Sequence, residues 1–159
     1  MITIRKITKQ DNSTLATIIR SCLTEFGADK PGTVYYDEST DHLYELFNNP
    51  QSVYFVAELD RKIVGGAGLF PSDGLPQDTC ELVKMYLLPA ARQTGIGSAL
   101  MNKCLEAAKQ NGFKNIYLET LPELKRAISV YEKFNFTYLN GPLGNTGHHG
   151  CSVWMSREL

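Results

Sequence analysis

The sequence predicts an α/β fold in which a sheet of about seven strands is combined with four helices. Short alternating or fully apolar runs, typical of strands, recur along the chain. Longer segments carry apolar residues three and four positions apart, as helices do. Between Glu81 and Gln110 a buried strand passes through a glycine-containing turn into a helix, which is typical of a ligand-binding α/β fold.

The length and composition of the chain limit the classes of function that it can have. The chain has 159 residues and is 43% hydrophobic, which predicts one ordered domain over 1–159 with a core of its own. Lys and Arg number 16 against 17 acidic residues, so we expect neither a nucleic-acid footprint nor a polybasic membrane anchor. No run is long enough for a membrane span and the N-terminus lacks a signal-peptide core, so we expect a cytoplasmic protein.

The four cysteines are far apart and form no C-x-x-C pair. We therefore expect free thiols in a reducing compartment rather than a disulfide framework. Two of them fall on the apolar faces of predicted elements and should be buried. The cysteines are Cys22, Cys80, Cys104 and Cys151, of which Cys80 and Cys104 are the two expected in the core.

The first half of the chain alternates between the two kinds of pattern. Pro31-Gly32 signals a turn, Asn48-Asn49-Pro50 ends a helix, and Asp60-Arg61 joins two strands as a hairpin. Three glycines at 65, 66 and 68 predict a bulge or a close backbone contact. The expected elements are a strand over 2–7, a helix capped at Asp11, Asn12 or Ser13 and running to about Glu25, a helix over 37–47, and strands over 52–59 and 62–70.

The second half follows the same reasoning. The central strand stops at Pro89, the helix after it stops at Asn111-Gly112, and Pro122 suits a first helical turn. The expected elements are a loop over 71–78, a strand over 79–88, a helix over 98–110, a strand over 115–120, a helix over 122–133, and strands over 136–139 and 151–156.

The turn Arg92-Gln93-Thr94-Gly95-Ile96-Gly97 exposes the amides of a helix N-terminus directly after a strand. Such an end binds phosphate through unpaired N–H groups and the helix dipole. A Walker loop would end in Gly-Lys-Ser/Thr, and a dinucleotide fingerprint would carry a third glycine. The chain has neither, and the pattern that fits is Q/R-x-x-G-x-G/A.

This pattern resembles motif A of the GCN5-related N-acetyltransferases, the GNAT family, whose loop amides hold the pyrophosphate of acetyl-coenzyme A. The strand residues 82–89 and the block 127–136 extend the resemblance, and the order of elements matches the GNAT fold over the whole chain. The resemblance implies a mixed sheet whose parallel fourth and fifth strands splay apart, with helices on both faces. It also implies that the pantetheine arm of the cofactor pairs with the fourth strand.

By this resemblance the cofactor-binding residues lie on the fourth strand and in the loop that follows. The strand would contribute its backbone, since its side chains suit core packing, and no metal is expected. The implied cofactor-binding residues are Met85, Tyr86, Leu87, Arg92, Gln93, Thr94, Gly95, Ile96, Gly97 and Ser98.

Two residues resemble the family's acid and base. Tyr131 occupies the tyrosine of an A-x-x-x-Y-x-x-x-G-F block, in which Asn135 replaces the glycine, and a phenol can donate a proton to a leaving thiolate. The alternative is a buried core tyrosine. Glu81 resembles the glutamate that takes the proton of the amine, the alternative being a solvated carboxylate at a strand end. Glu119, at the end of the next strand, is the rival base.

The resemblance places the acceptor pocket between segments 26–36 and 141–150. His148, His149 and Asn145 are candidates for contacting the acceptor, although a mobile loop tip would explain them equally. A metal site formed by His148, His149 and Cys151 is poorly spaced. His42 is expected on a helix surface and Trp154 in the core.

The expected function is N-acetyl transfer from acetyl-coenzyme A to a primary amine of a small molecule or peptide, directly within a ternary complex. The alternative is a non-catalytic module that binds acyl-coenzyme A and contacts a protein partner. The sequence identifies neither the acceptor nor the oligomeric state, a homodimer included.

Overall fold

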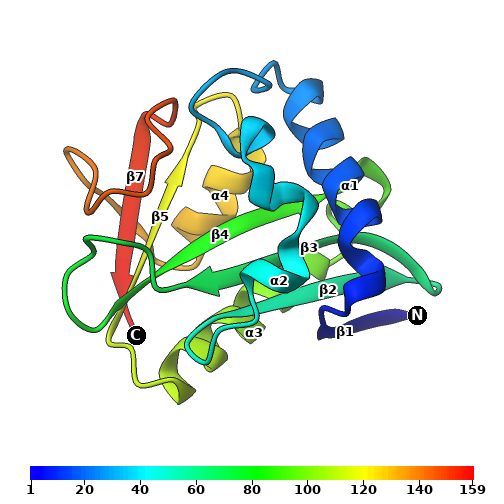
Figure 1. The fold of residues 1–159 in the computed structure, drawn as a ribbon, viewed down its shortest axis with the longest axis horizontal. Helices are drawn as coiled ribbons and strands as arrows, with labels where there is room; N and C mark the ends of the chain where they lie inside the picture. The colour runs from blue at the N-terminus through cyan, green and yellow to red at the C-terminus, as the bar shows by residue number, and fades with distance from the viewer.

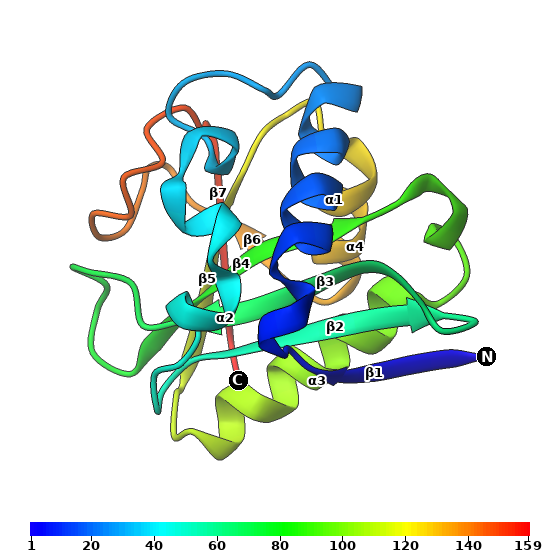
Figure 2. The same ribbon diagram turned by 45° about the vertical axis from the view of Figure 1, so that its right-hand side comes forward.

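The computed structural model describes residues 1–159 as a seven-stranded mixed sheet with helices on both faces (Figures 1 and 2). The strand order is β1-β2-β3-β4-β5-β7-β6, and every neighbouring pair is antiparallel except the parallel pair β4 and β5. The strands are β1 (Ile2–Lys6), β2 (Val53–Leu59), β3 (Lys62–Phe70), β4 (Thr79–Leu87), β5 (Asn115–Thr120), β6 (Thr137–Tyr138) and β7 (Val153–Glu158).

The helices divide the core into two apolar clusters, one on each side of the sheet. Helix α1 (Asn12–Glu25) and the short α2 (Leu43–Leu46) lie on the front face in Figure 1, and α3 (Ile96–Gln110) and α4 (Lys125–Lys133) lie behind it. Leu100 and Met101 of α3 are fully buried against the sheet, and Leu15 of α1 is fully buried on the other face. No helix has both the length and the apolar character needed to cross a bilayer.

Two local predictions for the β2–β3 hairpin are confirmed. Asp60 and Arg61 both adopt positive φ, at 49° and 67°, as a tight turn between twisted strands requires. A Cβ on Gly66 or Gly68 would lie 2.5 or 2.6 Å from the ring of Tyr54, so these glycines let the buried tyrosine cross the neighbouring strand. All four cysteines are free, and Cys80 and Cys104 are buried.

The predicted helix over 37–47 is wrong. Two short 3₁₀ turns, Val34–Tyr36 and Glu38–Asp41, precede the single turn of α2. Ser, Thr, Asp and His are weak helix formers, and their side chains compete for backbone groups. Thr40 illustrates this, because its buried hydroxyl donates to the Val34 carbonyl at 2.7 Å. His42 is exposed, as expected.

Several predicted boundaries in the second half also shift. Helix α4 begins at Lys125 rather than Pro122, after a turn in which the Leu124 amide donates to Leu121. Strand β7 begins two residues later than predicted and lies between β5 and β6. Trp154 on β7 is only half-buried, so its assignment to the core is wrong; its neighbour Met155 faces the core instead.

A β-bulge interrupts β4 at Lys84, whose φ is 52°. Gly66 of β3 pairs with Tyr86 and Gly68 pairs with Val83, so two residues of β4 oppose one of β3. The Tyr54 hydroxyl donates to the Lys84 carbonyl at 2.8 Å and holds the bulge in place. The extra residue resets the alternation of side chains along the strand.

Candidate active site

The site forms where β4 and β5 separate. The two strands pair only over three residues, ending at Glu81 opposite Tyr117. From Leu82 to Leu87 the β5-facing edge of β4 has no strand partner. Unpaired backbone groups at such an edge are available to an extended ligand that carries amides of its own. The predicted splay between the fourth and fifth strands is therefore present.

The loop after β4 ends in a run of free amides. Arg92 donates its amide to Pro89 at 3.2 Å, and the next amide with a backbone partner is that of Ala99, which donates to Gly95. The six amides from Gln93 to Ser98 donate to no protein group. Gly95 caps α3 at φ 90°, and Gln93 also has a positive φ of 62°. The backbone thus folds into a concave set of N–H groups suited to an anion.

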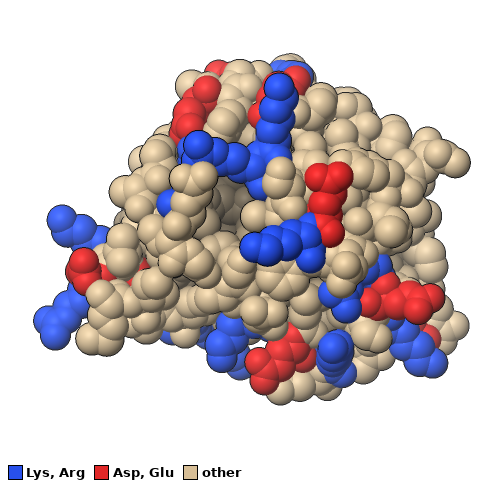
Figure 3. All heavy atoms as spheres, turned by 180° about the vertical axis from the view of Figure 1, so that it is seen from behind, with Lys and Arg blue, Asp and Glu red and all other residues tan.

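A cleft of about 570 Å³ opens beside these amides. Met85, Tyr86 and Leu87 of β4 form one wall, and residues of α4 form the other. Arg92, Arg126 and Lys133 line it, and no acidic side chain does. Figure 3 shows a hollow on the rear face that Lys and Arg side chains border. The cleft therefore combines an apolar floor with positive charge, as a ligand with an extended arm and phosphate groups requires.

The Arg92 side chain is committed to the protein itself. Its guanidinium donates to both carboxylate oxygens of Glu25 at 2.6 and 3.0 Å and to the Leu87 carbonyl at 3.0 Å. It also lies over the Phe26 ring, 5.1 Å from the centroid. These contacts join the loop to the end of α1, so Arg92 can attract a phosphate through its charge while it fixes the loop.

Tyr131 belongs to the apolar cluster behind the sheet and also reaches the point where β4 and β5 separate. It is 6% exposed, packs against Phe136, and lines a small cavity of about 40 Å³ between β4 and β5. Its hydroxyl makes no hydrogen bond within the protein, yet it is not sealed from solvent. Burial raises the pKa of Tyr131 above its ordinary value, so the phenol keeps its proton at neutral pH.

Glu81 is 3% exposed, so it is not the solvated carboxylate that was the alternative. Ser72 donates to one of its oxygens at 2.5 Å. Burial raises the pKa of Glu81 to about 7, and the nearby Glu119 charge adds to the rise while the Ser72 bond opposes it. A carboxyl with this pKa exchanges a proton readily near neutrality, which suits a general base.

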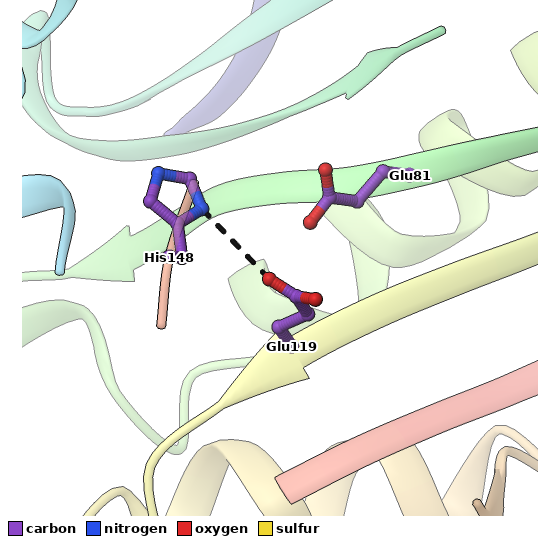
Figure 4. A group of neighbouring side chains, drawn as sticks. All are labelled: Glu81, Glu119 and His148. Carbon is purple, nitrogen blue, oxygen red and sulfur yellow. Dashed lines mark ion pairs between the residues drawn. The ribbon is translucent and has the colours of Figure 1, made fainter. Parts of the chain in front are cut away.

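Glu119, the rival base, lies beside Glu81 and is held by hydroxyl groups. Tyr117 donates to one carboxylate oxygen at 2.6 Å, and Thr146 donates to the other. His148 approaches the same carboxylate with Nδ1, 4.0 Å from Oε1 (Figure 4). Glu81, Glu119 and His148 thus converge from β4, β5 and the β6–β7 segment, with one polar atom of each within 4.8 Å of the others.

Asp37 fixes the histidine from the opposite side. Its Oδ2 lies 2.7 Å from His148 Nε2 and 3.7 Å from Lys84 Nζ. Burial raises the pKa of the Asp37 carboxyl, but the nearby His148 and Lys84 outweigh this effect and hold the pKa below its usual value. The ionised carboxylate can only accept, so Nε2 carries a proton, and in the neutral ring Nδ1 is then an acceptor.

A second pocket, of about 220 Å³, opens over these groups on the α1 side of the sheet. Asp37, Lys84, His148 and Asn145 line it, so two of the three predicted acceptor candidates face it. His149 does not: it is exposed and packs against Gly32. His148 is grouped with the two glutamates, and not with His149 and Cys151, whose spacing already disfavoured a joint site.

The segment 141–150 roofs this pocket through two close glycine contacts. Gly144 lies against Gly74, where Asn145 donates to Asp73 at 2.9 Å, and Gly150 donates to Gly32 at 3.0 Å. A Cβ on Gly32 would lie 2.6 Å from the Gly150 nitrogen, so only glycine fits.

Sequence reasoning missed several residues of the site: Asp37, Ser72, Lys84, Tyr117 and Thr146. Lys84 offered a signal, because a lysine inside an apolar strand needs a partner or a function. The others are polar residues in turns or next to a known candidate, and nothing in their local pattern distinguishes them. Their roles follow from contacts between segments far apart in the chain.

Comparisons with known proteins agree with this architecture. The model of the acetyltransferase (GNAT) family matches residues 15–136. The uncharacterized N-acetyltransferase YjgM of Escherichia coli is 44% identical over 98% of this chain and 93% of its own. A Staphylococcus aureus GNAT acetyltransferase superposes with a TM-score of 0.86 at 21% identity, covering 99% of both chains. The Thermoplasma acidophilum PaiA N-acetyltransferase, solved with coenzyme A, gives 0.77 at 21% identity, covering 100% of this chain and 99% of that one.

The two structural likenesses show the fold. The family model covers most of the chain, and the bacterial relative matches nearly all of it. The chain therefore belongs to the GNAT family of acetyltransferases and is an enzyme of that family.

Proposed function

We propose that the protein transfers the acetyl group of acetyl-coenzyme A to a primary amine, directly and within a ternary complex. The observation that carries this proposal is that three neighbouring pockets share lining residues. Met85, Tyr86 and Leu124 line both the cationic cleft and the small cavity between β4 and β5. Glu81, Lys84 and His148 line both that cavity and the pocket on the other side. Acetyl-coenzyme A and the amine would meet where β4 and β5 separate.

The residues of the cleft fit the cofactor. The free amides from Gln93 to Ser98 would hold the diphosphate, with positive charge from Arg92, Arg126 and Lys133 around it. The unpaired edge of β4 would pair with the amides of the pantetheine arm. The coenzyme-A complex of the Thermoplasma relative supports this choice of ligand.

When bound, acetyl-coenzyme A supplies an acetyl thioester. Glu81 takes a proton from the acceptor ammonium, since an alkyl ammonium is almost fully charged at neutral pH and cannot attack. The freed nitrogen lone pair forms the new N–C bond, and the C–S bond breaks with its electron pair on sulfur. Tyr131 lines the same cavity and donates its proton to the thiolate, and the nitrogen of the new amide gives up its second proton to restore the phenol.

An amine screen with thiol detection tests the proposal, after calorimetry has measured acetyl-coenzyme A binding. We expect tight binding and turnover of at least one class of primary amine. Absence of binding would refute the cofactor assignment. Binding without turnover across amines, amino acids, polyamines and peptides would favour the non-catalytic acyl-coenzyme-A module instead.

A further inference from the structure

We propose that Glu81, Glu119 and His148 form a tripod for the reactive ammonium group of a small primary alkylamine, so that the site selects primary over N-methylated amines. This inference rests on the proposed function and names the acceptor class. It concerns the same cavity that Tyr131 lines, on the side facing the acceptor pocket. Figure 4 shows the three side chains converging.

The spacing of the three acceptor atoms fits an ammonium group. Hydrogen bonds of about 2.9 Å in tetrahedral directions place three acceptors about 4.7 Å apart. The tripod atoms all lie within 4.8 Å of one another, and His148 Nδ1 lies 4.0 Å from Glu119 Oε1. A metal ion with bonds of about 2.0–2.4 Å would draw its ligands to separations nearer 3 Å. The 4.0 Å between His148 Nδ1 and Glu119 Oε1 is wider than the separation of two metal ligands and suits N–H donors.

Each of the three tripod side chains can still accept a hydrogen bond. Ser72 uses one oxygen of Glu81, and the other oxygen has no partner although the side chain is 97% covered. The Glu119 oxygens each receive one hydroxyl, which leaves a second lone pair on each. In its neutral form His148 offers Nδ1 as an acceptor, because Nε2–H is donated to Asp37. The three side chains thus offer three acceptor atoms, which matches the three N–H donors of a primary ammonium group.

The size and charge of the cavity agree with this ligand. Its volume of about 40 Å³ exceeds the roughly 10–15 Å³ that a cavity needs to hold one water, and an ammonium group is of similar size to a water. Lys84 also faces the cavity; burial lowers its pKa, and Asp37, 3.7 Å from its Nζ, offsets its charge. The two glutamates then leave the cavity attractive to a cation. A methyl group on the nitrogen would remove one donor and leave one acceptor without a partner.

The pocket behind the tripod limits the rest of the acceptor. Its 220 Å³ are lined by apolar Leu46, Phe70 and Val83 as well as by polar groups. The roof over 141–150 closes it against the 71–78 loop and the segment after α1. These walls suit a short alkyl chain better than a polymer.

Direct binding tests the tripod without requiring turnover. Ligand-observed NMR would titrate the coenzyme-A-loaded protein with n-butylammonium and N,N-dimethylbutylammonium at constant ionic strength. We expect saturable binding of the primary amine and at least tenfold weaker binding of the dimethyl compound, since two charge-assisted hydrogen bonds are lost. Equal affinity for both compounds, or no binding of butylammonium, would overturn the proposal.

Paired variants distinguish direct contacts between the tripod side chains and the amine from effects on the fold. Glu119→Gln and His148→Gln should each weaken butylammonium roughly tenfold to a hundredfold, because a charged or Nδ1 acceptor is lost. His148→Asn should bind better than His148→Gln, since its oxygen stands near the Nδ1 position. The exposed His149→Gln is the matched control and should bind normally.

Two results keep this inference separate from the proposed function. Unchanged affinity in Glu119→Gln and His148→Gln, with their melting temperatures preserved, would refute the tripod while acetyl-coenzyme A binding stands. Loss of coenzyme A binding in calorimetry would instead refute the proposed function, and the same amine titration on the protein alone would still decide the tripod.

Discussion

Replacing Gly97 by valine should remove most cofactor binding and leave the ligand-free protein folded. Gly97 lies in the first turn of α3 and lines the cleft. A Cβ placed on it would meet only Leu87 Cδ1 at 3.6 Å and Met85 Cε at 3.9 Å, which are ordinary contact distances. The protein thus has room for a side chain there, and a ligand that approaches the backbone explains the glycine better than packing does.

The size of the effect follows from the blocked amides. Loss of two charge-assisted hydrogen bonds, at about 1.5–3 kcal/mol each, weakens binding by at least about 100-fold. At a concentration 100 times the wild-type Kd, acetyl-coenzyme A stabilises the wild type by about 2.7 kcal/mol, or roughly 5–10 °C in Tm for a chain of this size. The same concentration should raise the Tm of Gly97→Val by only about 1–2 °C.

A thermal-shift assay with two controls measures this. Asn102→Val, exposed on the same helix and outside the cleft, should keep the full ligand-induced shift. Gly97→Ala should raise the ligand-free Tm by roughly 1–4 °C, because alanine stabilises a helix by about 0.5–1 kcal/mol over glycine. A folded Gly97→Val variant that retains the wild-type shift would refute the reasoning.

Three further predictions concern the acid, the base and the loop. Tyr131→Phe should lower kcat by about 100-fold or more with little change in Tm, because the hydroxyl bonds to no protein group; undiminished turnover would contradict the acid role. Since Glu81 must be ionised to act and its pKa is about 7, kcat/KM should rise through pH 7, and Glu81→Gln should abolish that rise. The raised pKa also means that the folded state keeps a proton that the unfolded chain releases above about pH 4.5, so wild-type stability falls between pH 4.5 and 7. Urea titrations should show Glu81→Gln gaining about 3 kcal/mol on the wild type across that range, and a constant difference would argue against the shift. Arg92→Ala should lower the free energy of unfolding by about 1–2 kcal/mol through loss of the Glu25 and Leu87 contacts, and an unchanged urea midpoint would contradict this.

The amide loop was predictable from the sequence because it is local, whereas the separation of β4 and β5 was implied only by the family resemblance. A buried strand, a glycine turn and an amphipathic helix are neighbours in the chain, so their order predicts their geometry. The hairpin at Asp60-Arg61 and the left-handed Asn135, at φ 68°, were predictable for the same reason. Such features need no knowledge of what packs against them.

The tripod was out of reach because its members meet only in the folded protein. Glu81 and Glu119 are 38 positions apart, and His148 is oriented by Asp37, 111 positions away. The segment around Asp37 was predicted as a helix, which would have placed this carboxylate differently. Buried hydroxyl contacts such as that of Thr40 overrode the apolar spacing there.

The bulge at Lys84 determines which side chains of β4 face each side of the sheet. Before it, Glu81 and Val83 face the acceptor side; after it, Met85 and Leu87 join the cluster on the opposite side, which an uninterrupted pleat would not allow. One inserted residue therefore places Glu81 on one face of the strand and Met85 on the other. If Lys84 were kept in a regular pleat without the bulge, Met85 and Leu87 would turn to the face of Glu81 and Val83, so the bulge fixes which face each half of β4 presents.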